Sequence, residues 1–454
     1  MDPLCFTSAE EARAFVEEHE APAVKVGVFD IDGVLRGKYV SKSKFLSILE
    51  KGFGFCDVVL GWDSNDQLYD NVKLTGWHTG YPDASVRLLP ETGRHLPLED
   101  GVLFLGEFVG EAEQVCPRGV LRRVIEKARS MGFEPFSALE YEFFLFKETP
   151  DSVREKGYRD LKPWTPGNFG YSVLRNSVHH EFYDDLLRLA VAMDFEIEGL
   201  HTETGPGVLE AAIAVDGTLA SADKGALFKT FCKVLAQRHE LMATFMAKWS
   251  PDYPGQSGHI HLSLQDKSGK SVFHDPDGPH GMSKTMRHFT AGCQALMPGV
   301  LAMVASTVNS YTRLIPGFWA PTNPTWGVEN RTCALRVVPG SPSSQRLEYR
   351  IAAADANPYL ALAASLMSGL YGIENELEPS EMVVGNAYDR PQDPETALPT
   401  TLWEAAQRLK ACQPARDMLG DAFVDHFAAT REWEEREFRR HITDWEMRRY
   451  FEIT

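Results

Sequence analysis

The fold is decided by the stretch Leu139-Glu140-Tyr141-Glu142-Phe143-Phe144-Leu145-Phe146. This short run is rich in aromatic and apolar residues and follows a helix-like segment and a break at Gly132 and Pro135, which predicts a buried strand. Alternate residues of a strand face the same side, so Glu140 and Glu142 are expected side by side. Two neighbouring carboxylates inside a protein are costly unless a cation lies between them. The pair therefore either binds a metal ion or lies on the solvated face of an edge strand.

The length, net charge and cysteine content restrict the class of protein. The chain has 454 residues, which is enough for one large domain or two to three ordinary ones. Its formal net charge of −18 argues against nucleic acid and anionic membranes as partners. The first residues show no secretory signal, and the longest apolar stretch, 289–308, contains Gln294 and Pro298, which favours a buried helix over a membrane span. The seven cysteines are scattered without a C-x-x-C pair, which predicts reduced thiols in a cytoplasmic protein.

Two domains are predicted. Residues 24–31 and 34–40 flank Asp32-Gly33, a strong hairpin signal, and residues 1–115 are interpreted as a small mixed domain of sheet and helix. Pro117 would then begin the first helix of a larger domain, 116–454, at its N1 position. In that domain strands alternate with long helical segments. The helical candidates are 118–131, 178–193, 220–248, 282–310, 357–375 and most of 403–451.

A second carboxylate pair follows in the block 201–210, which reads His-Thr-Glu-Thr-Gly-Pro-Gly-Val-Leu-Glu. A Gly-Pro-Gly turn between two strand-like runs can fold Glu203 and Glu210 back towards one point. Further along, His259-Ile260-His261-Leu262-Ser263 places two imidazoles and a hydroxyl on one face of a strand. Neutral imidazole together with carboxylates suits a divalent cation. Solvated loop acids and surface histidines are the alternative interpretation of these patterns.

Five arginines lie in the later part of the sequence, between residues 313 and 350. The strand 345–350 carries Glu348 on a charged face, and guanidinium forks match phosphate and carboxylate groups in two-point contacts. No G-x-x-x-x-G-K-[ST] loop is present, so a P-loop is excluded. The residues together predict a polyphosphate site and metal-assisted phosphoryl transfer to an anionic acceptor. The arginines concerned are Arg313, Arg331, Arg336, Arg346 and Arg350.

In these motifs the chain resembles the glutamine synthetases. The resemblance runs over nearly the whole sequence, through 139–144, 201–210, 259–261, 309–317, 330–336, 346–350 and 355–360. It implies an α+β fold, with an N-terminal β-grasp domain and a catalytic domain that contains a curved antiparallel sheet. It also implies ATP-dependent formation of γ-glutamyl phosphate from glutamate, and active sites between neighbouring subunits of a ring, commonly a dodecamer of two hexamers.

The resemblance assigns roles residue by residue. It implies two or three Mg²⁺ or Mn²⁺ ions per site, one held by Glu142, Glu203 and Glu210 and a second by Glu140, His259 and Glu348. The glutamate and phosphoryl clamp would be Arg313, Arg331 and Arg350, with Gly255 at the other end of the glutamate. The ATP contacts would be His261, Ser263, Arg336 and Arg346.

Further roles rest on looser matches. Asp63, or Asp66 as a substitute, resembles the aspartate that reaches a neighbouring subunit's amine site. The amine would be deprotonated by Asp63 or Glu203. Tyr388 matches a tyrosine that some family members adenylylate, although a plain loop residue is the simpler interpretation.

One departure from the family pattern bears on the substrate. Ammonia-using members carry a glutamate two residues after the Pro-Gly of the 313–317 motif, where it helps to bind ammonium and takes up its proton. Here Trp319 stands at that position, and indole cannot accept a proton but can pack against carbon or an alkylammonium. Pro254 also replaces an asparagine that the family often has. The alternative is that Trp319 only packs in its loop.

The sequence therefore predicts an ATP-dependent ligase that joins glutamate to an organic amine, as in the γ-glutamylpolyamine, alkylamide or anilide synthetases. Two other functions stay open: an ammonia-using glutamine synthetase, and a catalytically silent relative that keeps the ring. In each case we expect small-molecule substrates or self-association, and no nucleic-acid or membrane partner.

Overall fold

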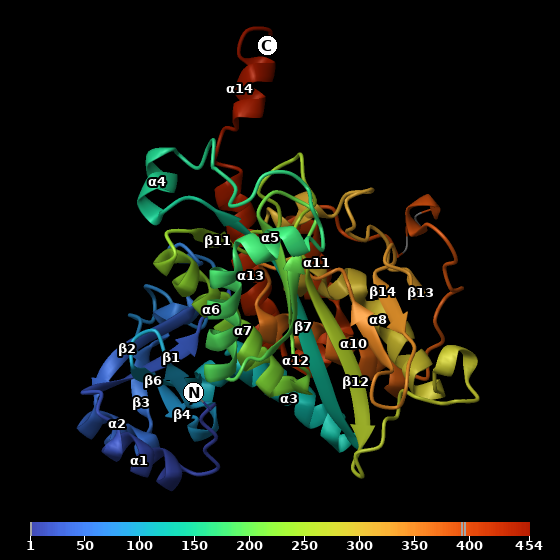
Figure 1. The fold of residues 1–454 in the computed structure, drawn as a ribbon. Coiled ribbons are helices and arrows are strands. Elements are labelled where there is room, and N and C mark those ends of the chain that lie inside the picture. Colours follow the sequence, from blue (N-terminus) through green and yellow to red (C-terminus); the bar gives the residue numbers. More distant parts are fainter. Residues whose placement is uncertain (1, 392–393, 395) are drawn as a thin grey trace.

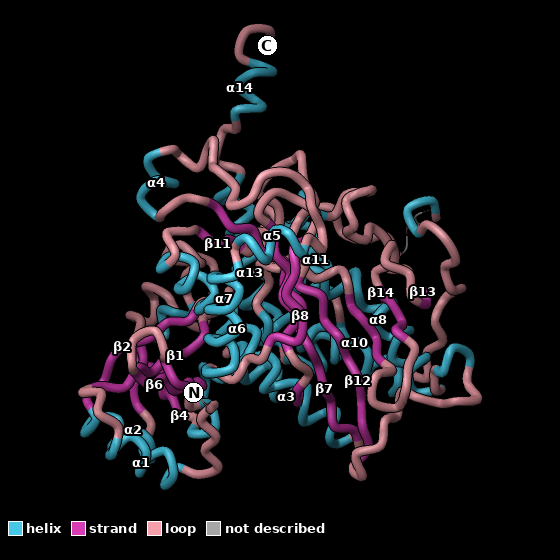
Figure 2. Tube along the Cα trace, viewed as in Figure 1, coloured by secondary structure: helices cyan, strands magenta, loops and turns pink. Residues whose placement is uncertain are grey.

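Two β-sheets organise the chain. The structure, a computed structural model, describes residues 2–391, 394 and 396–454. The smaller sheet lies in the N-terminal part and the larger one runs through the middle of the molecule, where β7 and β12 are its longest strands (Figure 1). Figure 2 separates these strands from the helices that surround them.

The smaller sheet has the order β2-β1-β6-β4-β3, with β5 paired to β6. Only the β1–β6 pair is parallel in the described part of this sheet. The predicted hairpin is confirmed, and Gly33 takes a φ of +80° in its turn. Helices α1 (Ala9–Glu18) and α2 (Lys42–Lys51) cover the sheet. The strands are β1 (Ala23–Phe29), β2 (Leu35–Ser41), β3 (Phe53–Cys56), β4 (Asp83–Leu88), β5 (Arg94–Leu96) and β6 (Gly101–Phe108).

The larger sheet has nine strands, in the order β13-β14-β15-β12-β7-β9-β8, with β10 and β11 also paired to β7. Its described pairs are antiparallel except the short β13–β14 pair at one edge, which agrees with the predicted antiparallel sheet. The strands are β7 (Phe133–Phe146), β8 (Ile197–Thr202), β9 (Val208–Ile213), β10 (Asp216–Gly217), β11 (Met242–Thr244), β12 (Gly258–Asp266), β13 (Trp326–Val328), β14 (Leu335–Val338) and β15 (Arg346–Tyr349).

The long helices begin close to where the sequence predicts them, and Pro117 is the first residue of α3. The helix predicted at 220–248 is ten residues too long. It ends at Arg238, because Glu240 adopts a φ of +56° and the chain reverses into β11. The helices are α3 (Pro117–Ser130), α4 (Pro150–Glu155), α5 (Val173–Val178), α6 (His180–Ala192), α7 (Thr218–Arg238), α8 (Lys284–Val304), α9 (Ser310–Arg313), α10 (Pro358–Glu374), α11 (Leu402–Ala411), α12 (Gln413–Leu419), α13 (Asp421–Phe438) and α14 (Asp444–Tyr450).

The main hydrophobic core spans both sheets. Strand β7 alternates between buried residues such as Leu139 and Tyr141, which pack against α7, and half-buried ones on its other face. The same core includes Leu105 of β6 and Val120 of α3, on either side of residue 115. The division into domains at that residue therefore stays a prediction. In the described part of the chain, no helix has the length and apolar character that crossing a bilayer requires.

Candidate active site

The polar face of the larger sheet brings predicted site residues from five strands, β7, β9, β12, β14 and β15, into neighbouring positions. Glu142 of β7 lies opposite Glu210 of β9, and Glu140 lies opposite His259 of β12. His261 lies opposite Glu348 of β15. Directly opposed residues in a sheet are close enough for their side chains to interact. The strand alternation therefore turns acids and imidazoles from distant parts of the sequence towards one another.

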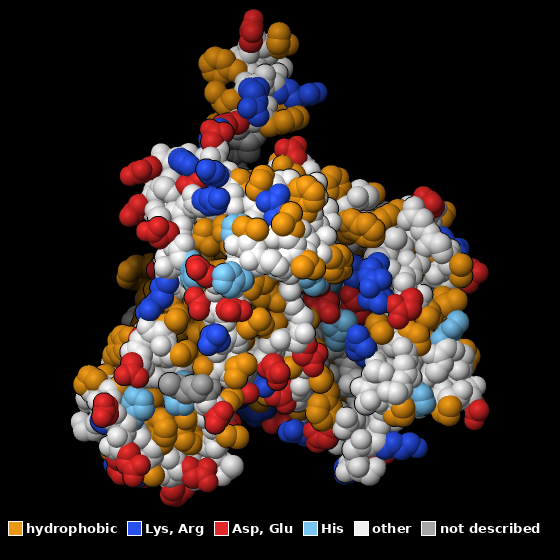
Figure 3. All heavy atoms as spheres, in the orientation of Figure 1, with side chains coloured by type: hydrophobic (Ala, Val, Ile, Leu, Met, Phe, Trp, Pro, Cys, Tyr) orange, Lys and Arg blue, Asp and Glu red, His pale blue; other side chains and the backbone are white. Residues whose placement is uncertain are grey.

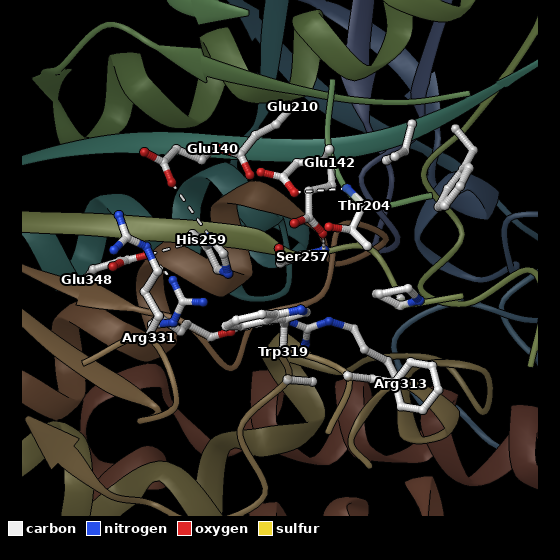
Figure 4. A pocket seen from close by; sticks show the side chains of 18 of the residues that line it. Glu140, Glu142, Thr204, Glu210, Ser257, His259, Arg313, Trp319, Arg331 and Glu348 are labelled. Carbon is white, nitrogen blue, oxygen red and sulfur yellow. Dashed lines mark hydrogen bonds and ion pairs between the residues drawn. The ribbon is translucent and has the colours of Figure 1, made fainter. Parts of the chain in front are cut away.

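All of these side chains except that of His261 line a cavity of about 540 Å³. Figure 3 shows acidic, imidazole and basic side chains meeting in a hollow right of centre. In Figure 4, Glu140, Glu142 and Glu210 lie on one side of the cavity, and Trp319 lies opposite them, close to the arginines. The predicted site residues that line it are Glu140, Glu142, Glu203, Glu210, Gly255, His259, Arg313, Trp319, Arg331, Arg336, Glu348 and Arg350.

One acidic and imidazole cluster surrounds Glu140. The Nδ1 atom of His259 lies 3.6 Å from Glu140 Oε2 and 3.5 Å from Glu348 Oε1. The Nε2 atom of His261 lies 3.0 Å from Glu140 Oε1. Burial alone would raise the pKa of Glu140, but the imidazoles of His261 and His259 outweigh it and hold this pKa below its usual range. The carboxylate is therefore charged and available to bind a cation.

A second acidic cluster adjoins the first. Glu203 and Glu210 lie 3.8 and 3.4 Å from the two ring nitrogens of His201. Glu142 accepts a 2.6 Å hydrogen bond from the backbone N–H of Ser257. Burial, followed by the charge of Glu210, raises the pKa of Glu142. Partly buried carboxylates crowded in this way repel one another, and a cation between them would relieve that repulsion.

Arginines form the opposite wall. Arg313 is 2% exposed and donates hydrogen bonds to the backbone oxygens of Ile351 and Arg350, at 2.9 and 3.2 Å. Burial lowers the pKa of Arg313 to about 10, which still leaves it cationic at neutral pH. A Cβ at Gly255 would lie 2.6 Å from Arg313 Cγ and 2.5 Å from the Ala247 oxygen. Glycine at this position thus lets the backbone pack directly against the aliphatic part of the Arg313 side chain.

Four predicted residues lie outside the cavity lining. His261 and Arg346 form a hydrogen-bonded pair beside it, 3.1 Å from Arg346 Nε to His261 Nδ1, and Ser263 follows on the same face of β12. Asp63 lies in the N-terminal part, where its carboxylate accepts hydrogen bonds from two backbone N–H groups. Its role in a neighbouring copy stays a prediction. The possible substitute Asp66 is paired with Arg36 at 2.7 Å.

The cavity also contains residues that the sequence did not single out. Tyr171 lines it and stacks on His201, with ring centroids 4.4 Å apart. His201 could have been noticed, since it belongs to the same short block as Glu203 and Glu210. Tyr171 lies in a loop with no distinctive pattern. Phe144 and Val208 add apolar surface near the acids.

A family model described as "Glutamine synthetase, catalytic domain" matches residues 114–450. The chain belongs to the glutamine synthetase family. It is 46% identical to "Type-1 glutamine synthetase 2" of Dictyostelium discoideum over 96% of this chain and 84% of that protein. It is 36% identical to "Glutamate--isopropylamine ligase" of a Pseudomonas species, over 98% of each. Among solved structures, "Apo GmaS without ligand" matches with a TM-score of 0.83 at 26% identity, covering 97% of this chain and 99% of that one.

Glutamine synthetases are ligases that depend on ATP and on a divalent metal, and the donors here fit such an ion. Carboxylate and imidazole groups are the ligands that Mg²⁺ and Mn²⁺ accept. Two groups of three such side chains have ligand atoms within 4.8 Å of one another: Glu140, His261 and Glu348, and His201, Glu203 and Glu210. His259 also lies within 3.6 Å of Glu140 and Glu348. Which imidazole belongs to each ion therefore stays a prediction.

Proposed function

We propose that this glutamine synthetase family member is an ATP-dependent ligase that joins the γ-carboxylate of L-glutamate to an organic amine. The observation that carries the proposal is Trp319, which lines the same cavity as the six predicted metal ligands. At the position where the ammonia-using pattern has a carboxylate, this chain offers an indole. An indole cannot attract ammonium or accept its proton, but it can contact the carbon of a substituted amine.

In the proposed reaction, the γ-carboxylate of glutamate attacks the terminal phosphorus of ATP, which yields γ-glutamyl phosphate and ADP. The amine nitrogen then attacks the acyl carbon and phosphate leaves. Arg313, Arg331 and Arg350 would hold the glutamate and the transferred phosphoryl group. Their positive charges would stabilise the negative charge that develops on the phosphoryl oxygens. The proton of the attacking amine would pass to Glu203 or to Asp63 of a neighbouring copy.

The metal-binding residues in this proposal are those inferred from the sequence. Glu142, Glu203 and Glu210 would hold one ion, and Glu140, His259 and Glu348 another. When bound, two or three Mg²⁺ or Mn²⁺ ions supply positive charge that neutralises the ATP phosphates. The side chains that would contact the nucleotide are His261, Ser263, Arg336 and Arg346.

An ammonia-using glutamine synthetase is the second candidate, because the Dictyostelium relative at 46% identity carries that name. The metal-ligand residues and the arginines would be equally suited to either acceptor. The candidates therefore differ only in which nitrogen compound attacks the acyl phosphate. A catalytically silent relative is the third candidate, although the charged side chains gathered in the cavity argue for catalysis.

An amine panel tests the proposal. ADP release would be followed with glutamate, ATP and, in turn, ammonia, methylamine, isopropylamine, putrescine, ethanolamine and aniline. We expect at least one amine to exceed ammonia in kcat/KM. Ammonia exceeding every amine would establish the second candidate, and no turnover with any amine, together with no metal binding, would establish the third.

A substitution of Trp319 tests whether this residue determines the choice between ammonia and an organic amine. Trp319→Glu restores a proton acceptor and removes the apolar contact, so we expect the ratio of ammonia to amine kcat/KM to rise by about tenfold or more. Trp403→Glu is the matched control, because Trp403 is a similarly exposed tryptophan on α11. An unchanged ratio in Trp319→Glu would reject the assigned role of Trp319.

We also propose that the chain assembles into rings of the family type. The last helix, α14, projects away from the rest of the molecule (Figure 1). Around it Trp445, Phe451 and Ile453 are exposed, which is unusual for large apolar side chains unless another surface covers them. The mass in solution, measured by light scattering, would decide between a monomer and a dodecamer.

A further inference from the structure

The segment that carries Trp319 has an irregular backbone. Gly317 has a φ of +82°, and Trp319 itself has a φ of +63°. Glycine adopts a positive φ without strain, but for other residues this conformation costs free energy. Neighbouring contacts must therefore stabilise the backbone at Trp319. The Trp319 side chain is 57% exposed, so its own packing fixes it only in part.

The residues on either side of Trp319 are each anchored. The ring of Phe318 lies 4.2 Å from the Nζ of Lys248, a cation–π distance. Ala320 is buried, and its carbonyl oxygen accepts a 3.1 Å hydrogen bond from the hydroxyl of Tyr388. Trp319 is thus held from both neighbours, once through a ring contact and once through a hydrogen bond.

Tyr388 is itself fixed to the turn that carries Arg331. It lies in the short 3₁₀ helix η5 (Ala387–Asp389), whose first residue donates its backbone N–H to Thr332 Oγ1 at 2.9 Å. The side chain of Asn330 donates to the Gly385 oxygen at 2.8 Å. One short segment therefore connects the Trp319 loop with the residues on both sides of Arg331.

The Tyr388 hydroxyl is a donor throughout the neutral pH range. Burial raises its pKa, and the nearby charges of Arg350 and Arg313 offset this only in part. The same arginines line the cavity. The hydroxyl thus stays protonated next to the predicted clamp, and its hydrogen bond to Ala320 is not lost by ionisation.

We propose that Tyr388 is a positioning residue for the attacking amine: its hydroxyl, through the carbonyl of Ala320, holds Trp319 at the cavity wall. This inference rests on the proposed function in so far as Trp319 contacts the amine. It predicts that Tyr388 affects the binding of the amine far more than the binding of ATP or glutamate, since the Tyr388 hydroxyl donates to the carbonyl beside Trp319 and not to a residue of the predicted glutamate or ATP contacts.

Tyr388→Phe tests the inference because it removes the hydroxyl and keeps the ring. We expect the KM for the preferred amine to rise about three- to tenfold, the range for loss of one hydrogen bond, while the KM values for ATP and glutamate change less than twofold. The matched control is Tyr39→Phe, which removes a hydroxyl bonded to Glu99 at 2.6 Å in the N-terminal sheet. It should leave all three KM values unchanged.

A double variant asks whether Tyr388 acts through Trp319. In a Trp319→Ala background, Tyr388→Phe should no longer change the KM for the amine. Hydrogen exchange gives a readout without turnover: the peptide 315–325 should exchange faster in Tyr388→Phe than in the native protein. Unchanged exchange and an unchanged amine KM would overturn the inference, as would an effect of equal size in the Trp319→Ala background.

The two proposals fail differently. If the native protein prefers ammonia, the proposed function is wrong, and the ammonia KM and the exchange of 315–325 then decide the role of Tyr388. If the native protein uses amines and Tyr388→Phe changes neither quantity, only the role of Tyr388 is wrong.

Discussion

Arg346 Nε donates a 3.1 Å hydrogen bond to Nδ1 of His261. A neutral imidazole that accepts at Nδ1 carries its proton on Nε2, which makes that atom a donor and not a metal ligand. This Nε2 is buried and has no well-aligned hydrogen-bond acceptor among the described residues, although Glu140 lies 3.0 Å away. We therefore predict that His261 donates to a bound anionic group and that His259 is the metal ligand.

We therefore expect substitutions of His259 and His261 to have different effects on metal binding and on ATP binding. His259→Ala should weaken Mn²⁺ binding by about tenfold or more, the range for loss of a metal-binding group, with ATP binding affected mainly through the metal. His261→Ala should raise the KM for ATP and change Mn²⁺ affinity in the absence of nucleotide by less than about threefold. Electron paramagnetic resonance titration of free Mn²⁺ measures the first quantity. The reverse pattern would assign the metal to His261.

Removal of the buried arginine of α13 should destabilise the protein strongly. Arg431 is 1% exposed and donates to Asp32 of the N-terminal hairpin at 2.7 Å and to the Ser306 oxygen at 2.6 Å. Arg431→Met leaves Asp32 without its ion-pair partner, which we expect to cost about 3 to 5 kcal/mol in the free energy of unfolding. Urea denaturation measures it. Arg439→Met, which removes an exposed arginine paired with Glu435 at 3.0 Å, should cost no more than about 1 kcal/mol.

Stability should also depend on pH through Glu434. Burial raises the pKa of this carboxyl from 4.5 to about 7, although Arg431 acts in the opposite direction. The folded state then holds a proton that the unfolded state has released between about pH 4.5 and 7, so the free energy of unfolding falls as pH rises through this window. Glu434→Gln removes that penalty.

Denaturation at pH 5 and pH 8 tests this sign. We expect Glu434→Gln to be more stable than the native protein at pH 8, by about 1 to 3 kcal/mol, and close to it at pH 5. A variant that is less stable at pH 8 would mean that the charged carboxylate contributes stability through Arg431.

Strand alternation was the part of the site that the sequence could predict. The period of two along β7 and β12 places Glu140 with Glu142 and His259 with His261, whatever the rest of the chain does. Which strands pair is a different matter, since β7 and β9 are separated by some sixty residues that the sequence pattern does not relate. The family resemblance supplied that link, and the roles of the ligands stay predictions.

Local helix propensity did not predict the end of α7, because tertiary contacts determine the structure there. Leu241, Met242 and Ala243 favour helix, which agrees with the predicted helix over 220–248. Their pairing with β7 overrides this preference. Tyr171 could not be found in advance, because a loop residue enters a site only through packing that no periodicity records.

The opposed pairs on the larger sheet have a consequence for how this protein can change. A shift of one residue in the pairing of β12 with β7 would turn His259 and His261 to the apolar side and bring Ile260 and Leu262 to the cavity. Insertion or deletion of one amino acid inside either strand would thus remove several charged groups together. Tolerated length changes are expected only in the connecting loops, so the sheet interior can vary by substitution alone.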